Sequence, residues 1–200
     1  MSKVLIVPGL HDSPAEHWQT WLEQRLPDAE RVKQRNWADP ALEPWARRLE
    51  KAIAVAGGDA IVVAHSFGCL AALRAMSRHP DKVRGALLVA PADPKKFGIT
   101  CPSSAALAPI RTIVVGSEND PWMSIDVARG IAERIDGDFV NLGLAGHINI
   151  ASGYGPWPAA ERLIDGFRKP LSRSFIRTKW GAPNPRTDDS KTEFRGVFCP

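Results

Sequence analysis

Short apolar runs alternate along this chain with segments of helical periodicity, and that alternation limits the possible folds more than any other feature. The apolar runs are rich in Val, Ile and Leu and show little polar alternation, which is typical of parallel strands covered on both faces. We expect strands over residues 3–7, 60–64, 85–90, 112–116 and 138–142, with a weaker one over 31–34.

Amphipathic helical patterns lie between most of these runs. In the first of them Trp18, Trp21, Leu22 and Leu26 share one face. We expect helices over 16–26, 43–56, 67–77, 125–135 and 159–167, with Ser124 as the N-cap of the fourth. This order predicts an α/β fold of three layers, in which a doubly wound, mostly parallel sheet of about six strands lies between helices.

The pattern of strands and helices stops near Lys169. We expect one domain over 1–168 and a basic, proline-containing, poorly ordered tail over 169–200. The net charge of +4 fits this division: residues 168–200 hold eight basic and three acidic residues, whereas residues 1–167 hold 18 and 19. Because the domain is close to neutral, we expect no nucleic-acid partner.

The N-terminal apolar run and the cysteines bear on the compartment. The run from Val4 to Val7 is too short for a signal peptide or a membrane span, so we expect no membrane partner. Cys69, Cys101 and Cys199 are odd in number and match no disulfide framework or zinc motif. They indicate a reducing compartment, and we expect a cytoplasmic location.

The stretch Ala64-His65-Ser66-Phe67-Gly68 lies between an expected strand and an expected helix. It matches the G-x-S-x-G pattern of a nucleophile elbow, with Ala in place of the first Gly. In such an elbow a strand turns sharply into a helix, so the residues two before and two after the serine must be small. The pattern predicts Ser66 as a nucleophile; a serine in an ordinary buried turn is the alternative.

A serine hydroxyl needs a base to remove its proton, and in this fold the chain order is Ser, acid, His. His147 lies in a glycine-containing loop after the last expected strand and is the predicted base. The other histidines precede the serine, adjoin it or end a helix: His11, His17, His65 and His79. The side chain of His65 is expected to point away from that of Ser66, because neighbours along a strand alternate.

Two carboxylates follow the strand over 112–116. Asp120 is the predicted acid and Glu118 the reserve, because a Gly-x-x-x-Asp spacing from Gly116 fits the usual turn after that strand. An Asp before Pro121 also favours a turn without any catalytic role.

The loop over residues 8–13 follows the first strand and is expected to complete an oxyanion hole. We expect its donors to be the backbone N–H groups of Leu10 and Phe67, with that of His11 as an alternative. His11 and Trp122 are the candidate residues of the substrate pocket, whereas Trp18, Trp21 and Trp45 are expected in the core.

Several of these residues carry a family resemblance: Pro8-Gly9, Ser13, His17-Trp18-Gln19, Trp21, Trp37, Pro40, Trp45 and the elbow at 64–68. From about Val4 to Phe167 the chain resembles the small YdeN-like hydrolases, a family that includes the retinoblastoma-binding serine hydrolase. The resemblance implies a compact α/β-hydrolase fold and a triad that falls on Ser66, Asp120 and His147. It does not extend to the tail, and the chain lacks a Leu-x-Cys-x-Glu string, so binding of a pocket protein is not expected.

These features predict a serine hydrolase of carboxylesterase type that cleaves a small ester, amide or thioester through an acyl-Ser66 intermediate. Residues 91–109 leave room for only a small cap or none, which favours a small-molecule substrate. The alternatives are a non-catalytic interaction module on the same fold and an acyltransferase with the same triad. No cofactor or metal is expected, because His11, Asp12 and His17 match no metal motif.

Overall fold

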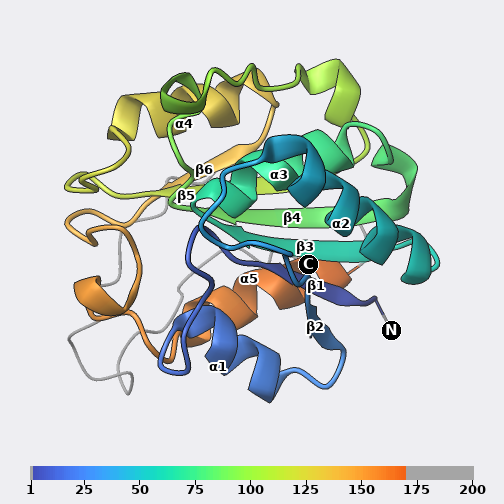
Figure 1. Cartoon of the computed structure of the whole chain (residues 1–200), viewed down its shortest axis with the longest axis horizontal. Helices are drawn as coiled ribbons and strands as arrows, with labels where there is room; N and C mark the ends of the chain where they lie inside the picture. The colour runs from blue at the N-terminus through green and yellow to red at the C-terminus, as the bar shows by residue number, and fades with distance from the viewer. Residues whose placement is uncertain (1, 170–200) are drawn as a thin grey trace, which may run out of the picture.

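The computed structural model describes residues 2–169, whose strands form a six-stranded parallel sheet in the order β2-β1-β3-β4-β5-β6 (Figure 1). The strands are β1 (Val4–Val7), β2 (Ala29–Arg31), β3 (Ala60–His65), β4 (Val83–Val89), β5 (Arg111–Gly116) and β6 (Asp138–Asn141). The predicted α/β fold is thereby confirmed. The expected tail lies, apart from Lys169, outside the described residues.

Helices cover both faces of the sheet and give the three predicted layers (Figure 1). One face carries α1 (Trp18–Arg25) and α5 (Pro158–Arg168), and the other carries α2 (Leu42–Val55), α3 (Phe67–Met76) and α4 (Ile125–Arg134). The helix α4 begins as predicted, because Ser124 Oγ accepts a hydrogen bond from the Val127 N–H at 3.3 Å.

The weak strand was placed too late in the sequence. The structure has β2 over Ala29–Arg31 instead of 31–34, paired with β1 alone at the edge of the sheet. An edge strand needs few apolar residues, so its first two residues gave no apolar signal, and the prediction centred on Val32. The Val32 N–H still donates to the Ile6 carbonyl at 2.8 Å, which extends the pairing by one residue.

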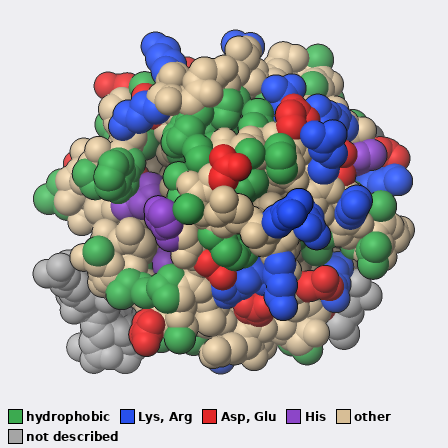
Figure 2. All heavy atoms as spheres, viewed as in Figure 1, with side chains coloured by type: hydrophobic (Ala, Val, Ile, Leu, Met, Phe, Trp, Pro, Cys, Tyr) green, Lys and Arg blue, Asp and Glu red, His purple; other side chains and the backbone are tan. Residues whose placement is uncertain are grey.

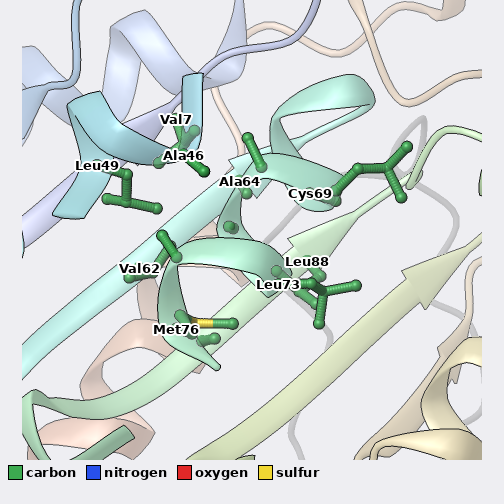
Figure 3. Packing of buried hydrophobic residues seen from close by; sticks show 14 of the residues in the cluster. Val7, Ala46, Leu49, Val62, Ala64, Cys69, Leu73, Met76 and Leu88 are labelled. Carbon is green, nitrogen blue, oxygen red and sulfur yellow. The ribbon is translucent and has the colours of Figure 1, made fainter. Parts of the chain in front are cut away.

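Two clusters of buried side chains pack on the two faces of the sheet. Alternate residues of β3 serve opposite clusters, since Val62 faces α2 and α3 whereas Ile61 faces α1 and α5. Figure 3 shows the cluster beneath α2 and α3. Trp18 and Trp45 are buried as expected, but Trp21 is only half-buried, with the Arg25 guanidinium over its ring.

The chain reverses its direction across the sheet at β1, because β2 lies on one side of β1 and β3 on the other. Loops that leave neighbouring parallel strands at such a reversal diverge and open a crevice at their carboxyl ends. The segment between β4 and β5 holds only the 3₁₀ turns Pro94–Phe97 and Ser104–Leu107, so the cap is small. Within residues 2–169, no helix is long and apolar enough to span a bilayer.

Candidate active site

Ser66 lies between β3 and α3, at the sharp turn expected over 64–68. Its backbone has φ 52° and ψ −125°, a conformation that non-glycine residues rarely adopt and that persists only where the surroundings impose it. The Ser66 N–H donates to the Val89 carbonyl at 3.1 Å, and the Ser66 carbonyl accepts from the Ala92 N–H at 3.1 Å. These bonds to β4 and the residues after it hold the strained turn in place.

Two glycines let neighbouring backbone approach this turn closely. A Cβ on Gly68 would overlap the carbonyl oxygens of Val7 and Pro8, and a Cβ on Gly9 would lie 2.7 Å from the Cβ of Ser66. The small residue required at position 68 is therefore dictated by the chain leaving β1. The same packing brings the loop after β1 against Ser66.

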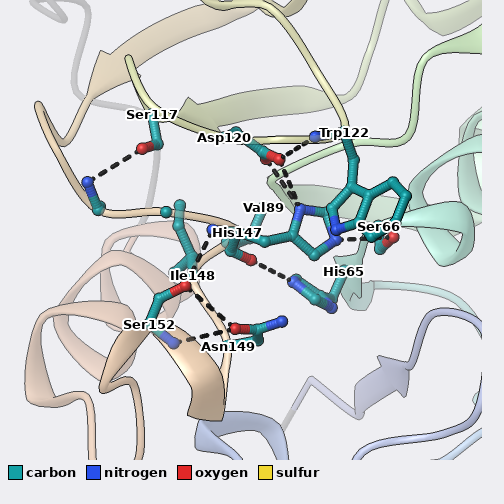
Figure 4. A network of polar contacts seen from close by, with 12 residues as sticks. His65, Ser66, Val89, Ser117, Asp120, Trp122, His147, Ile148, Asn149 and Ser152 are labelled. Carbon is teal, nitrogen blue, oxygen red and sulfur yellow. Dashed lines mark hydrogen bonds and ion pairs between the residues drawn. The ribbon is translucent and has the colours of Figure 1, made fainter.

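The imidazole of His147 connects Ser66 to Asp120. His147 Nε2 lies 3.0 Å from Ser66 Oγ, and His147 Nδ1 lies 2.8 Å and 3.0 Å from the two carboxylate oxygens of Asp120 (Figure 4). Because a carboxylate only accepts, the neutral imidazole carries its proton on Nδ1 and presents the Nε2 lone pair to the serine hydroxyl. The structure thus brings together the three residues predicted as nucleophile, base and acid.

The two carboxylates after β5 have different surroundings. The side chain of Asp120 is 2% exposed, and one of its oxygens also accepts from the Trp122 N–H at 2.9 Å. Glu118 is exposed and accepts instead from Asn141 Nδ2 at 2.8 Å, so the reserve candidate does not contact His147.

Polar side chains after β5 fix the loop that leads to His147. Ser117 Oγ donates to the Gly143 carbonyl at 3.1 Å and accepts from the Ala145 N–H at 3.0 Å. Asn119 Oδ1 accepts from the Gly146 N–H at 2.6 Å. With the Glu118 N–H, which donates to the Gly143 carbonyl at 2.8 Å, these bonds join the loop that carries Asp120 to the loop that carries His147.

The backbone of His147 and Ile148 is held from three directions. Ser152 Oγ accepts from the His147 N–H at 3.0 Å, and His65 Nε2 lies 2.9 Å from the His147 carbonyl (Figure 4). Trp18 Nε1 donates to the Ile148 carbonyl at 2.9 Å. Trp18, expected only as a core residue, thus also positions the loop of His147.

The side chain of His65 was expected to point away from that of Ser66, and it lies against His147. This side chain makes no hydrogen bond with Ser66, but its ring lies 4.9 Å from that of His147, centroid to centroid. Alternation along β3 cannot place this side chain relative to His147, whose loop comes from a distant part of the sequence.

Each residue of His17-Trp18-Gln19 contacts a part of this site. His17 caps α1, since its Nδ1 accepts from the Gln19 N–H at 3.1 Å. Gln19 Nε2 donates to the carbonyls of Val7 and Val63, at 3.3 Å and 3.1 Å, in the strands that precede the two loops around Ser66. The motif was noticed in the sequence, but its links to β1, β3 and the His147 loop are long-range and were missed.

Two buried histidines lie side by side next to His147. The ring centroids of His17 and His65 are 5.0 Å apart. Burial, followed by the charge of Arg31, lowers the pKa of His17 to about 4. Burial and the neighbouring His147 lower the pKa of His65 well below its usual value. Both rings are therefore neutral at neutral pH.

A cavity of about 170 Å³ opens beside Ser66 and His147. It is lined further by Leu10, Asp12, Pro14, His17, His65, Asn149, Ile150 and Ala151. Neither His11 nor Trp122 lines it: His11 is exposed, and the Trp122 side chain stands in solvent at 60% exposure. In Figure 2 histidine side chains gather near the carboxyl edge of the sheet, with hydrophobic side chains beside them.

The predicted oxyanion donors lie beside Ser66. Phe67 is the first residue of α3, where backbone N–H groups have no acceptor within the helix, and Leu10 lines the cavity. The His11 N–H donates to the Trp37 carbonyl at 2.9 Å, so it is occupied. Over residues 2–169 no group of three or more His, Cys, Asp or Glu side chains is arranged to hold a metal ion.

This chain is similar in sequence and in fold to known proteins. The model of a family described as serine hydrolase matches residues 4–166. A YdeN-like hydrolase from Pectobacterium atrosepticum is 36% identical, with a TM-score of 0.78, over 84% of this chain and 91% of that chain. The ydeN gene product of B. subtilis is 22% identical, with a TM-score of 0.74, over 84% and 99%.

A carboxylesterase from Bacillus cereus is 13% identical, with a TM-score of 0.56, over 84% of this chain and 87% of that chain. At their low identities it and the B. subtilis protein show similarity of fold alone. No protein with a curated description matches.

Proposed function

Because this chain belongs to the serine hydrolase family, as its resemblance to the YdeN-like hydrolases predicted, we propose that it cleaves small esters, amides or thioesters through an acyl-Ser66 intermediate. The observation that carries the proposal is the hydrogen-bonded path from Ser66 through His147 to Asp120, with steps of 3.0 Å and 2.8 Å. Such a path activates a serine hydroxyl that is otherwise a poor nucleophile.

In the first step Ser66 Oγ attacks the substrate carbonyl carbon while His147 Nε2 takes the hydroxyl proton. Asp120 accepts from Nδ1–H and stabilises the imidazolium that forms. The proton then passes from Nε2 to the leaving alcohol, amine or thiol as the bond to the acyl group breaks. Ser66 is left as an ester of the acyl group.

The negative charge that develops on the carbonyl oxygen requires donors beside Ser66. The N–H groups of Phe67 and Leu10 are proposed for this role, because one begins α3 and the other belongs to the loop that Gly9 brings against Ser66. The positive end of the helix dipole of α3 supports the same charge.

In the second step His147 removes a proton from water, which attacks the acyl-Ser66 carbonyl carbon. The proton then passes from His147 Nε2 to Ser66 Oγ as the acyl bond breaks, which releases the acid and restores the serine hydroxyl. An acyltransferase would pass the same acyl group to an alcohol. The open site and small cap favour water as the acceptor.

The cavity beside Ser66 supports a small substrate. Its volume of about 170 Å³ is close to that of cavities that hold a benzene-sized molecule, roughly 150 Å³. We also propose a cytoplasmic location, which suits the free, buried thiols of Cys69 and Cys101.

Labelling with a fluorophosphonate probe tests the proposal. Wild-type protein should label and should hydrolyse p-nitrophenyl acetate, whereas Ser66→Ala should lose both. The turnover should fall by on the order of 10⁴-fold or more in Ser66→Ala and His147→Ala. Folded wild-type protein that neither labels nor turns over would leave the interaction module as the better interpretation. Product analysis with an added alcohol separates hydrolysis from acyl transfer.

A further inference from the structure

We propose that the cavity beside Ser66 binds a short substrate group that carries a hydroxyl, and that His17 is the residue that selects it. This inference rests on the hydrolase function proposed above and narrows it to a class of substrate. The cavity adjoins Ser66, so its occupant is one of the two groups that flank the scissile carbonyl.

His17 offers a fixed hydrogen-bond donor to this cavity. Its Nδ1 accepts from the Gln19 N–H, so the neutral ring carries its proton on Nε2. Within residues 2–169 this Nε2 makes no hydrogen bond. Among the described residues only Gln34 has a fully buried side-chain atom without a partner, so the Nε2–H of His17 is accessible from the cavity that His17 lines.

His65 supplies the complementary acceptor. Its Nε2 faces the carbonyl of His147 at 2.9 Å and must carry the proton there, which leaves a lone pair on Nδ1. This ring also lines the cavity, 5.0 Å from that of His17. A hydroxyl both accepts and donates a hydrogen bond, so it matches a neutral donor beside a neutral acceptor.

Charge in the cavity selects against an anionic group. Asp12 lines the cavity, and its Oδ1 accepts from Arg31 Nη1 at 2.9 Å and from the Ser13 N–H at 2.8 Å. Arg31 also pairs with Glu23 at 2.8 Å, so these three side chains sum to one negative charge. A substrate carboxylate would face Asp12 and two uncharged imidazoles, whereas a hydroxyl avoids that repulsion.

The test compares kcat/KM for matched esters that differ by one group. On the acyl side these are p-nitrophenyl butyrate, p-nitrophenyl β-hydroxybutyrate and p-nitrophenyl hemisuccinate. On the alcohol side they are ethyl acetate and ethylene glycol monoacetate. In one of the two series the hydroxyl ester should exceed its alkyl counterpart by about tenfold or more, because a site built for a hydroxyl discriminates against analogues that lack it. The hemisuccinate should be the poorest acyl substrate.

His17→Asn is the matched variant. Asn is a good N-cap and preserves the cap of α1, but its shorter side chain removes the Nε2–H from the cavity. The ratio of kcat/KM between the hydroxyl ester and its alkyl counterpart should fall to about one in this variant, and fluorophosphonate labelling reports whether Ser66 is still reactive. His79→Asn, at a residue that precedes the 3₁₀ turn Pro80–Lys82 and does not line the cavity, should keep the wild-type preference.

The outcomes separate the two proposals. Wild-type protein that labels but shows no hydroxyl preference in either series overturns this inference alone, and that result needs no variant to fold. A preference that survives in His17→Asn overturns the role of His17. Wild-type protein that fails to label overturns the hydrolase function as well.

Discussion

Ser66 and His147 lie 3.0 Å apart, but the chain holds them in place by different means. Ser66 is positioned by close packing of backbone, since Gly68 contacts the end of β1 and Gly9 contacts Ser66 itself. His147 is positioned by polar side chains that hydrogen-bond its own peptide groups and those of its loop. We call the surroundings of Ser66 the packed half of the site, because backbone contacts hold them, and the surroundings of His147 the polar half, because hydrogen bonds hold them.

The difference predicts how each half responds to change. A side-chain atom added at a tightly packed position overlaps its neighbours unless the backbone moves. The packed half should therefore tolerate almost no added side-chain volume. A hydrogen bond lost from the polar half costs less, because most of the groups involved keep a second partner. A single substitution in the packed half should therefore cost much stability and activity, whereas a single substitution in the polar half should cost little.

The largest effect is expected for Gly68→Ala. The new methyl group would overlap the backbone carbonyl oxygens of Val7, the last residue of β1, and of Pro8, which follows it. We expect the free energy of unfolding to fall by about 3 kcal/mol or more, together with loss of fluorophosphonate labelling. Urea unfolding measures the first change.

Gly130→Ala is the control for this variant. Gly130 lies within α4, and a Cβ added there meets no atom within 4 Å. Because Ala favours helix more than Gly does, this variant should be as stable as the wild type or more stable by up to about 1 kcal/mol. If Gly68→Ala were equally harmless, the turn would not depend on packing against β1.

We expect the free energy of unfolding to depend on pH through His65 and His17, which lie where the packed half meets the polar half. His65 ends β3 next to Ser66 and contacts the His147 carbonyl, and His17 lies against it. Folding lowers the pKa of both rings, so acid favours proton uptake by the unfolded chain. The contribution of His17 to stability is complete above pH about 6.5 and is lost as the pH falls toward 4, and that of His65 is lost in the same direction.

For His17 alone, the change to a pKa of about 4 lowers the free energy of unfolding by roughly 2 kcal/mol between pH 7 and pH 5. Urea unfolding at the two pH values measures this loss. His17→Asn should reduce the loss, because this variant removes the group whose pKa folding lowers. A loss that is the same in wild type and His17→Asn would show that His17 titrates normally in the folded protein.

The same contrast explains what could be predicted from the sequence. The strands, the helices and the turn at Ser66 follow from local patterns of apolar and small residues, and the structure has them close to where they were expected. The edge strand β2 was misplaced because an edge needs little apolar sequence. His147 was predicted because it follows the last expected strand and fits the order Ser, acid, His along the chain. That choice needed no knowledge of contacts between distant residues.

The cavity and the supports of His147 could not be predicted in this way. Trp18 and His65 reach the His147 loop through contacts between distant parts of the chain, and Ser152 hydrogen-bonds back to His147 across an irregular loop. His11 was predicted for the pocket, but it is His17, the N-cap residue of α1, that lines the cavity. Hydrogen bonds between loops leave no periodic signal in the sequence.

The smallest effect is expected for Ser117→Ala, in the polar half. The Ala145 N–H would keep a contact with the Gly143 carbonyl at 3.0 Å, and Asn119 Oδ1 would still accept from the Gly146 N–H, so each released group retains a partner. We expect a loss of about 1 kcal/mol in the free energy of unfolding. The looser His147 loop should lower kcat by about threefold to tenfold with little change in KM, because a displaced base slows proton transfer without weakening substrate binding.

Ser77→Ala removes a comparable bond, from Ser77 Oγ to the Arg74 carbonyl at 2.9 Å, far from His147. It should cost similar stability without changing kcat. If the two variants lower kcat equally, the bonds of Ser117 do not position His147.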